Sequence, residues 1–416
     1  MTGSMRDERA LIISADGHAG APMREYRPYV DAEFRDDFDA YATEYEARLG
    51  GSRITPPKHF FNPKVIEPYE ERMIASGAID GEFDPAVRID RLESDGIAAE
   101  IIFPNQGPFG IGFGPANVGA PDHARAAARA YNRWITDFCT DRTDRLGGQA
   151  LLTFLDVDED LETIRTAAEA RLKGLVIPGV DTTGRIPMLW DESLDPIWAA
   201  CEETGLPVNL HAGVGIPTYT APRPGMPAKV LIMLVGTEFP WFAHRPLWFL
   251  IYGGVFERHP LLKVVFTEQH CDWIPGILAR LDYSYTNFGT DDLWGYVPRK
   301  PSEYFASNCW VGASILSRAE AELRHEIGVD RMMFGADFPH VEGAWGQTTE
   351  YLQATVGHAG MTAPEARAFL GTTAAEVFGF DAAALAGIAA RCGPRLDDVL
   401  TPSDASPTPD VRRPRI

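Results

Sequence analysis

The sequence predicts a (β/α)8 barrel, and two observations support that fold class. Eight short apolar runs recur along the chain, and most are followed by a polar loop and then by a helical pattern. Continuous apolar strands that alternate with helices are typical of a parallel sheet covered by helices. About 250 or more residues in eight such units fit a closed barrel. An open doubly wound sheet is the alternative, but no glycine-rich phosphate loop follows the first run.

The predicted strands are 11–15, 99–103, 146–154, 174–177, 207–210, 264–267, 305–311 and 332–334. The clearest helix is 121–141, because it is rich in the strong helix formers Ala and Arg. Further helices are predicted over 158–172, 196–204, 276–282 and 317–327. Each helix lies between two of the strands, as a barrel requires.

Two segments interrupt this repeat. Residues 24–90 are charged, aromatic and punctuated by proline, and we predict a cap insertion over the strand ends there. Residues 214–246 are a second candidate insertion. We therefore expect one barrel domain over 8–385. Residues 393–416 are rich in Pro, Asp and Ser, which predicts an extended or disordered tail.

Composition narrows the classes of partner. The net charge of −21 opposes nucleic acid and anionic membranes as partners. No apolar run approaches the roughly 18–20 residues that span a bilayer, and the first ten residues lack the apolar core of a secretory signal. Five scattered cysteines suggest reduced thiols. We expect a cytoplasmic protein that acts on a small molecule, with the apolar region 229–256 as a candidate homo-oligomer interface.

Acidic and imidazole residues cluster where the predicted strands end. Asp16 and His18 follow the first strand, and side chains two apart on a strand point to the same side. The others are Glu100 within the second strand, His211 after the fifth, Glu268 and His270 after the sixth, and Asp337 after the eighth. In a barrel the carboxyl ends of all strands gather on one face, where active sites lie.

These seven residues are the predicted ligands of a metal site. Carboxylate and imidazole ligands suit Zn, Fe or Mn. Each residue also has a simpler interpretation, such as an Asp–His polar pair at a turn or one ion pair between Glu268 and His270. A carboxylate inside an apolar strand, as at Glu100, needs a partner or a cation. We expect His211, His270 and Asp337 to serve also as catalytic acids or bases.

Four stretches carry a resemblance to a known family: "SADGHAG", "LPVNLHAG", "GGVFERHPLLKVVFTEQHCDWIP" and "MMFGADFPHVEG". Together they resemble the amidohydrolase superfamily, in the branch of aminocarboxymuconate-semialdehyde decarboxylase and γ-resorcylate decarboxylase. The resemblance runs from residue 11 to about residue 380. It implies a barrel with a divalent metal on its C-terminal face, bound by Asp16, His18, His211 and Asp337.

The sequence departs from that family's pattern at two places. Asp16 stands where the decarboxylases commonly have His or Glu. After the sixth strand, Glu268 takes the place of a histidine, and His270 stands where a glycine is usual. Seven candidate ligands are more than one ion needs, so a site with two ions and a bridging carboxylate stays open.

Three functions compete at this point. The first is metal-dependent hydrolysis or non-oxidative decarboxylation of a carboxylated or acyl small molecule. The second is a non-haem diiron monooxygenase acting on a small hydrophobic substrate. The third is a non-catalytic barrel that keeps its metal for stability.

Several loop residues are predicted to serve the substrate or the ligands. An aromatic mouth, or alternatively packing of the cap, is expected from Phe60, Phe61, Phe109, Phe113, Trp241, Phe242 and Trp345. A substrate anion is expected to meet His244, Arg245, Arg299 or Lys300, and Asn105 and His340 are expected to orient the metal ligands.

Overall fold

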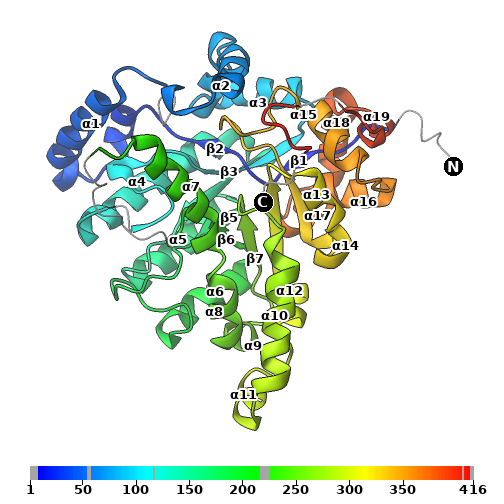
Figure 1. The fold of residues 1–416 in the computed structure, drawn as a ribbon. Coiled ribbons are helices and arrows are strands. Elements are labelled where there is room, and N and C mark those ends of the chain that lie inside the picture. Colours follow the sequence, from blue (N-terminus) through cyan, green and yellow to red (C-terminus); the bar gives the residue numbers. More distant parts are fainter. Residues whose placement is uncertain (1–7, 54–57, 116–117, 216–224, 405–406, 413–416) are drawn as a thin grey trace.

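The computed structural model describes residues 8–53, 58–115, 118–215, 225–404 and 407–412. Its strands gather in the middle of the molecule and its helices surround them (Figure 1). All strand pairs are parallel, in the order β1-β3-β4-β5-β6-β7-β8-β9, with β2 also paired to β3. The strands are β1 Ile13–Ser14, β2 His18–Ala19, β3 Ala99–Pro104, β4 Leu146–Leu151, β5 Gly174–Val176, β6 Val208–His211, β7 Val264–Thr267, β8 Cys309–Ser314 and β9 Met332–Gly335.

Strands β1 and β2 share one position of the barrel. β1 pairs with the beginning of β3 at Ala99, whereas β2 pairs with its end at Phe103. The ring closes between the first and last strands, because Ala15 N donates to Phe334 O at 2.7 Å and Asp337 N donates to Asp16 O at 3.0 Å. The predicted (β/α)8 barrel is therefore confirmed.

The helices that follow β3 to β6 begin with α4 Pro121–Cys139, α5 Val157–Glu169, α6 Asp195–Thr204 and α7 Ala228–Ala243. The C-terminal half adds α8 Pro246–Tyr252, α9 Val255–Arg258, α10 Trp273–Phe288, α11 Asp291–Tyr296, α12 Pro301–Asn308, α13 Arg318–Glu322, α14 Arg324–Ile327, α15 Thr348–Leu352, α16 Ala363–Arg367, α17 Thr373–Phe378, α18 Ala382–Cys392 and α19 Leu396–Leu400. Helix α4 shows why they form: it starts at a proline and buries Ala124, Ala127, Tyr131 and Ile135 at helical spacing. None of the described helices combines the length and apolar content that a bilayer crossing needs.

The segment predicted as a cap, 24–90, folds into α1 Arg35–Leu49, α2 Pro63–Tyr69 and α3 Pro85–Ser94. Its side chains Phe61, Tyr69 and Glu82 line a cavity described below, while a cap over the strand ends stays a prediction. The second candidate insertion contains α7. Residues 54–57 and 216–224 of these two segments lie outside the described residues.

Two expectations need correction. The seventh strand is β8, at Cys309–Ser314, because Phe305 belongs to α12, whose first turn starts at Pro301. The tail is not a free arm over its described residues. It contains α19, buries Leu396, Val399 and Val411, and its Val411 O accepts from Arg318 N at 3.0 Å.

Candidate metal centre

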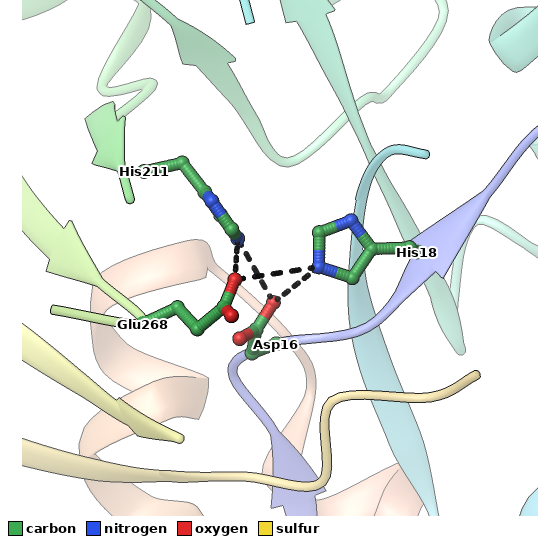
Figure 2. Close-up of side chains that lie close together, drawn as sticks. All are labelled: Asp16, His18, His211 and Glu268. Carbon is green, nitrogen blue, oxygen red and sulfur yellow. Dashed lines mark ion pairs between the residues drawn. The ribbon is translucent and has the colours of Figure 1, made fainter. Parts of the chain in front are cut away.

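Four side chains from separate strands converge at the carboxyl end of the barrel (Figure 2). Asp16 follows β1, His18 lies in β2, His211 ends β6 and Glu268 follows β7. The distance from His18 Nε2 to Asp16 Oδ1 is 3.4 Å, that from His211 Nε2 to Asp16 Oδ1 is 3.5 Å, and that from His211 Nε2 to Glu268 Oε2 is 3.2 Å. Ligands held 2.0–2.1 Å from a tetrahedral ion lie roughly 3.3 Å apart. The four donors are therefore spaced as ligands of one ion.

Asp337 and His340, which follow β9, join this centre from its other side. The distance from Asp337 Oδ1 to His18 Nε2 is 3.4 Å, and that to His340 Nδ1 is 2.7 Å. The structure thus contains two overlapping groups of donors, Asp16–His18–His211–Glu268 and His18–Glu268–Asp337–His340, each within 4.8 Å. His340 is the donor that sequence reasoning assigned only an orienting role. The sequence feature that could have identified His340 as a donor is its position three residues after Asp337.

Hydrogen bonds on the far side of the histidine rings fix which nitrogen faces the centre. His18 Nδ1 lies 3.2 Å from Pro104 O, and His211 Nδ1 lies 3.0 Å from Ala212 O. A carbonyl oxygen only accepts, so each Nδ1 carries the proton and each Nε2 keeps its lone pair. Asp16 is fixed in a similar way, because Ser314 Oγ donates to Asp16 Oδ2. Both imidazoles are therefore prepared to bind a cation.

The buried polar atoms of the centre also fit a cation. Among the described residues, no hydrogen-bond partner faces Asp16 Oδ1, His18 Nε2, His211 Nε2 or either oxygen of Asp337. Buried polar atoms in native proteins are nearly always paired. A divalent ion bound by these oxygens and nitrogens would satisfy them, and the donor set of carboxylates and imidazoles suits Zn, Fe or Mn.

Electrostatics within the centre follow from burial and from its three carboxylates. Burial, with His340 nearby, lowers the pKa of His18 to about 4, so His18 is neutral near pH 7. Burial, together with Asp337 and Asp16, raises the pKa of Glu268 well above its usual value. Burial opposes the ionisation of Asp337, but the neighbouring His340 and His18 outweigh it and lower the pKa of that carboxyl. A bound cation would relieve the repulsion among these carboxylates.

The local backbone is shaped for this convergence. A Cβ on Gly17 would lie 2.2 Å from Glu100 Oε1, so a larger residue between Asp16 and His18 would have to displace the buried Glu100–Arg88 pair. Glu268 and Asp337 adopt the left-handed region, with φ of 58° and 55°. Such conformations of non-glycine residues cost about 1–3 kcal/mol and tend to cluster at functional sites.

Two of the seven predicted ligands are not brought into the centre. Glu100 is fully buried and pairs with the equally buried Arg88, whose Nε donates to Glu100 Oε2 at 2.7 Å. His270 Nδ1 instead lies 3.6 Å from Glu320 Oε1. The other five predicted ligands, Asp16, His18, His211, Glu268 and Asp337, do come together.

A cavity of about 590 Å³ opens beside the metal centre. His18, Glu268 and His340 belong both to the centre and to the cavity wall. One wall is apolar and is formed by Phe61, Ile79, Phe113, Leu231, Ile232, Val235 and Phe239. Arg53, Glu82 and Glu342 bring charge to the rest of the lining. The volume suits a small organic molecule.

Of the aromatic residues predicted at the mouth, Phe61 and Phe113 line this cavity, and the Phe113 ring stacks on His211 with centroids 4.2 Å apart. Phe109 packs on Phe38, and Trp345 packs on Phe338. These two residues therefore fit the alternative prediction, in which the aromatic side chains serve packing. Trp241 contacts Phe242 and is 57% exposed.

Two of the side chains predicted to bind a substrate anion, His244 and Arg299, contact residues that do not line this cavity. His244 stacks on Trp273 at 3.9 Å, and Arg299 pairs with Glu257 at 3.1 Å. The orienting role predicted for Asn105 is consistent with the structure, because Asn105 Oδ1 lies 3.4 Å from His340 Nε2.

Comparison with known proteins decides the family. The family model described as amidohydrolase matches residues 107–380. The chain belongs to the amidohydrolase family. A γ-resorcylate decarboxylase of Rhodococcus jostii (strain RHA1) is 27% identical over 253 residues, which cover 54% of this chain and 70% of the relative. A 2-amino-3-carboxymuconate-6-semialdehyde decarboxylase of Dictyostelium discoideum is 27% identical over 279 residues, covering 63% and 70%. This amidohydrolase is therefore a metal-dependent enzyme, which sets aside the non-catalytic hypothesis.

Solved structures support the same fold. A 5-carboxyvanillate decarboxylase from Novosphingobium aromaticivorans, with bound manganese, has a TM-score of 0.63 at 20% identity and covers 89% of this chain and 97% of its own. A 2,6-dihydroxybenzoate decarboxylase in complex with 2,6-dihydroxybenzoate has a TM-score of 0.56 at 16% identity, covering 90% and 100%. At these identities the likeness concerns the barrel alone.

Proposed function

We propose that this amidohydrolase is a divalent-metal-dependent decarboxylase of a small organic acid with an apolar body. The observation that carries the proposal is the junction of the donor cluster with the cavity: His18 and Glu268 belong to both. The two curated relatives, both named as decarboxylases, support decarboxylation over hydrolysis.

Asp16, His18, His211 and Glu268 would hold the ion, which when bound would polarise a substrate oxygen and stabilise negative charge. Zn, Fe and Mn all suit this donor set. Mn²⁺ is the first ion to test, because similar structures of a 5-carboxyvanillate decarboxylase and a dihydroxybenzoic acid decarboxylase contain manganese.

The chain's own residues would seat the substrate and move its proton. Phe61, Phe113 and Phe239 would hold the apolar body, and Arg53 would attract the carboxylate. Decarboxylation breaks the bond between the carboxylate carbon and its neighbour. CO2 leaves, the electron pair stays on the neighbouring carbon, and a proton replaces the lost group. We assign the proton transfer to Asp337, because its Oδ2 is buried and has no hydrogen-bond partner among the described residues.

The test removes and restores the metal. Protein stripped by a chelator and reloaded with Mn²⁺ should release CO2 from an aromatic acid such as 2,6-dihydroxybenzoate or 5-carboxyvanillate, under nitrogen as well as in air. His211→Ala should abolish release without unfolding the barrel. His123→Ala is the matched control, since His123 pairs with Asp37 outside the centre. Full turnover after exhaustive chelation would contradict the proposal.

A diiron monooxygenase is the second candidate, and the two overlapping donor groups are the observation that favours it. Hydroxylation would place one atom of O2 on the substrate and reduce the other to water, with two electrons from an external reductant. Substrate loss that needs O2 and a reductant, with no CO2 released, would select this candidate.

A further inference from the structure

We infer that Gly236 leaves room in the cavity for a substrate bulkier than a single-ring acid, with an extended apolar body. This inference rests on the proposed function and concerns the substrate class of the same site. Gly236 lies in the middle of helix α7 and belongs to the lining of the cavity beside the metal centre. It is also exposed, so it lies at the rim where that cavity meets solvent.

Helix α7 presents an apolar face to the cavity. The side chains that it contributes to the lining recur at helical spacing, and they are Leu231, Ile232, Val235 and Phe239. Gly236 adjoins Val235 in this lining and adds no side chain of its own. Apolar surface leaves water favourably, so this face suits the apolar part of a ligand.

The cavity is larger than a single-ring acid requires. Its volume is about 590 Å³, which at roughly 30 Å³ per molecule corresponds to about 20 waters. A single-ring acid such as 2,6-dihydroxybenzoate, with about 11 non-hydrogen atoms, would leave roughly half of that space to water. Apolar surface that still faces water gains nothing from the ligand. A ligand with a further ring would displace this water from the apolar face of α7.

Neither a left-handed backbone nor close packing requires glycine at position 236. Gly236 does not have a positive φ, so its backbone accepts an L side chain. A Cβ at this position would meet no atom of the described residues within 4 Å. Glycine inside a helix is less favourable than alanine, because it loses more conformational freedom on folding. What this glycine provides is open space at the rim of the cavity.

A role in the helix backbone is the competing explanation. Pro240 lies in the same helix, and a proline ring crowds the carbonyl group of the residue four positions earlier, which is Gly236. If Gly236 only relieves this crowding, Gly236→Ala should already lower the thermal unfolding midpoint, and no variant should change which ligand binds better. If Gly236 provides space, the ligand preference should change with the size of the new side chain.

The experiment compares two acids that differ by one ring, benzoate and biphenyl-4-carboxylate. Their dissociation constants are measured by isothermal titration calorimetry with Mn²⁺-loaded protein, and the readout is the ratio of the two constants. We expect the unchanged protein to bind biphenyl-4-carboxylate at least about 10-fold more tightly, because the second ring is buried. The preference should persist in Gly236→Ala, decrease in Gly236→Leu and fall below about 3-fold in Gly236→Phe.

Gly276→Phe is the matched control. Gly276 lies in helix α10, outside the lining of the cavity, and a Cβ there also meets no atom of the described residues within 4 Å. This variant should keep the full preference. Binding of neither acid, equal binding of both by the unchanged protein, an unaltered preference in Gly236→Phe, or an equal loss in Gly276→Phe would each overturn the inference. Absence of CO2 release from any aromatic acid would instead refute the proposed function, and the ratio of dissociation constants would still be measurable.

Discussion

Replacing Glu100 by leucine tests whether this carboxylate stabilises the fold or binds the metal. Glu100 and Arg88 are both fully buried, and the guanidinium reaches Glu100 Oε2 at 2.6 and 2.7 Å. The same guanidinium donates to His18 O at 2.9 Å and to Gly81 O at 3.1 Å. Glu100→Leu would leave a buried cation without a carboxylate partner, held by these two carbonyl oxygens and by the Phe338 ring 4.0 Å away. Removing one partner of a buried ion pair destabilises a protein by about 3–5 kcal/mol.

This loss should appear as a lower free energy of unfolding, measured by urea titration of chelator-stripped protein. A decrease of about 3 kcal/mol lowers the folded-to-unfolded ratio roughly 150-fold. The double variant Arg88→Met/Glu100→Leu should recover most of the loss, because an apolar replacement of both partners leaves no unpaired charge. Bound Mn²⁺ per folded chain should stay at the value of the unchanged protein.

The opposite pattern would refute this reasoning. If Glu100→Leu loses bound Mn²⁺ while the unfolding free energy of the stripped protein stays within about 0.5 kcal/mol, Glu100 is a ligand and Arg88 is not its main partner.

Three further changes test the centre and its cavity. Gly17→Ala should weaken Mn²⁺ binding about 10–100-fold by displacing Asp16 or His18, whereas Gly119→Ala, where a Cβ meets no atom within 4 Å, should not. Arg53→Gln should raise KM for a carboxylate substrate with a smaller effect on kcat, as measured by CO2 release, if Arg53 attracts the substrate before reaction. Burial raises the pKa of Glu82 to about 7, so ionisation of this carboxyl above pH 7 adds negative charge to the cavity wall. KM for an anionic substrate should therefore rise with pH through 7, and less steeply in Glu82→Gln.

The barrel and most of its centre could be predicted because both depend on the repeat of strands. Apolar runs locate the strands, and parallel strands bring their carboxyl ends to one face, so Asp16, His211 and Asp337 meet although they are far apart in sequence. The seventh strand was predicted to begin too early, at residue 305, because an apolar run alone does not distinguish a buried strand from a buried helix. Pro301 begins a helix in that run.

The partner of Glu100 could not be derived from sequence. A carboxylate inside an apolar strand requires either a cation or a charged partner, and both satisfy the same pattern. Arg88 lies on α3, and its side chain reaches Glu100 on β3 and the carbonyl oxygen of His18 on β2 only in the folded chain. The tail was misjudged for a related reason. Its polar composition predicts disorder, but Leu396, Val399 and Val411 find buried positions on the barrel.

His270 shows where the rule of alternating side chains fails, and it yields a last prediction. Glu268 and His270 are two residues apart, as Asp16 and His18 are, yet only Glu268 faces the centre. Both Glu268 and His270 have left-handed backbones, with φ of 58° and 57°, so the strand geometry that aligns alternate side chains has ended. Glycine adopts this region without strain.

His270→Gly should therefore relieve backbone strain of about 1 kcal/mol. The variant loses the contact to Glu320, but Glu320 still accepts from Cys271 N at 2.9 Å and from Ser317 N at 2.8 Å. We expect the unfolding free energy to change by less than about 1 kcal/mol and the bound Mn²⁺ per chain to stay the same. A fall in bound metal without a fall in stability would return His270 to the ligand set, because the loss would then concern coordination and not folding.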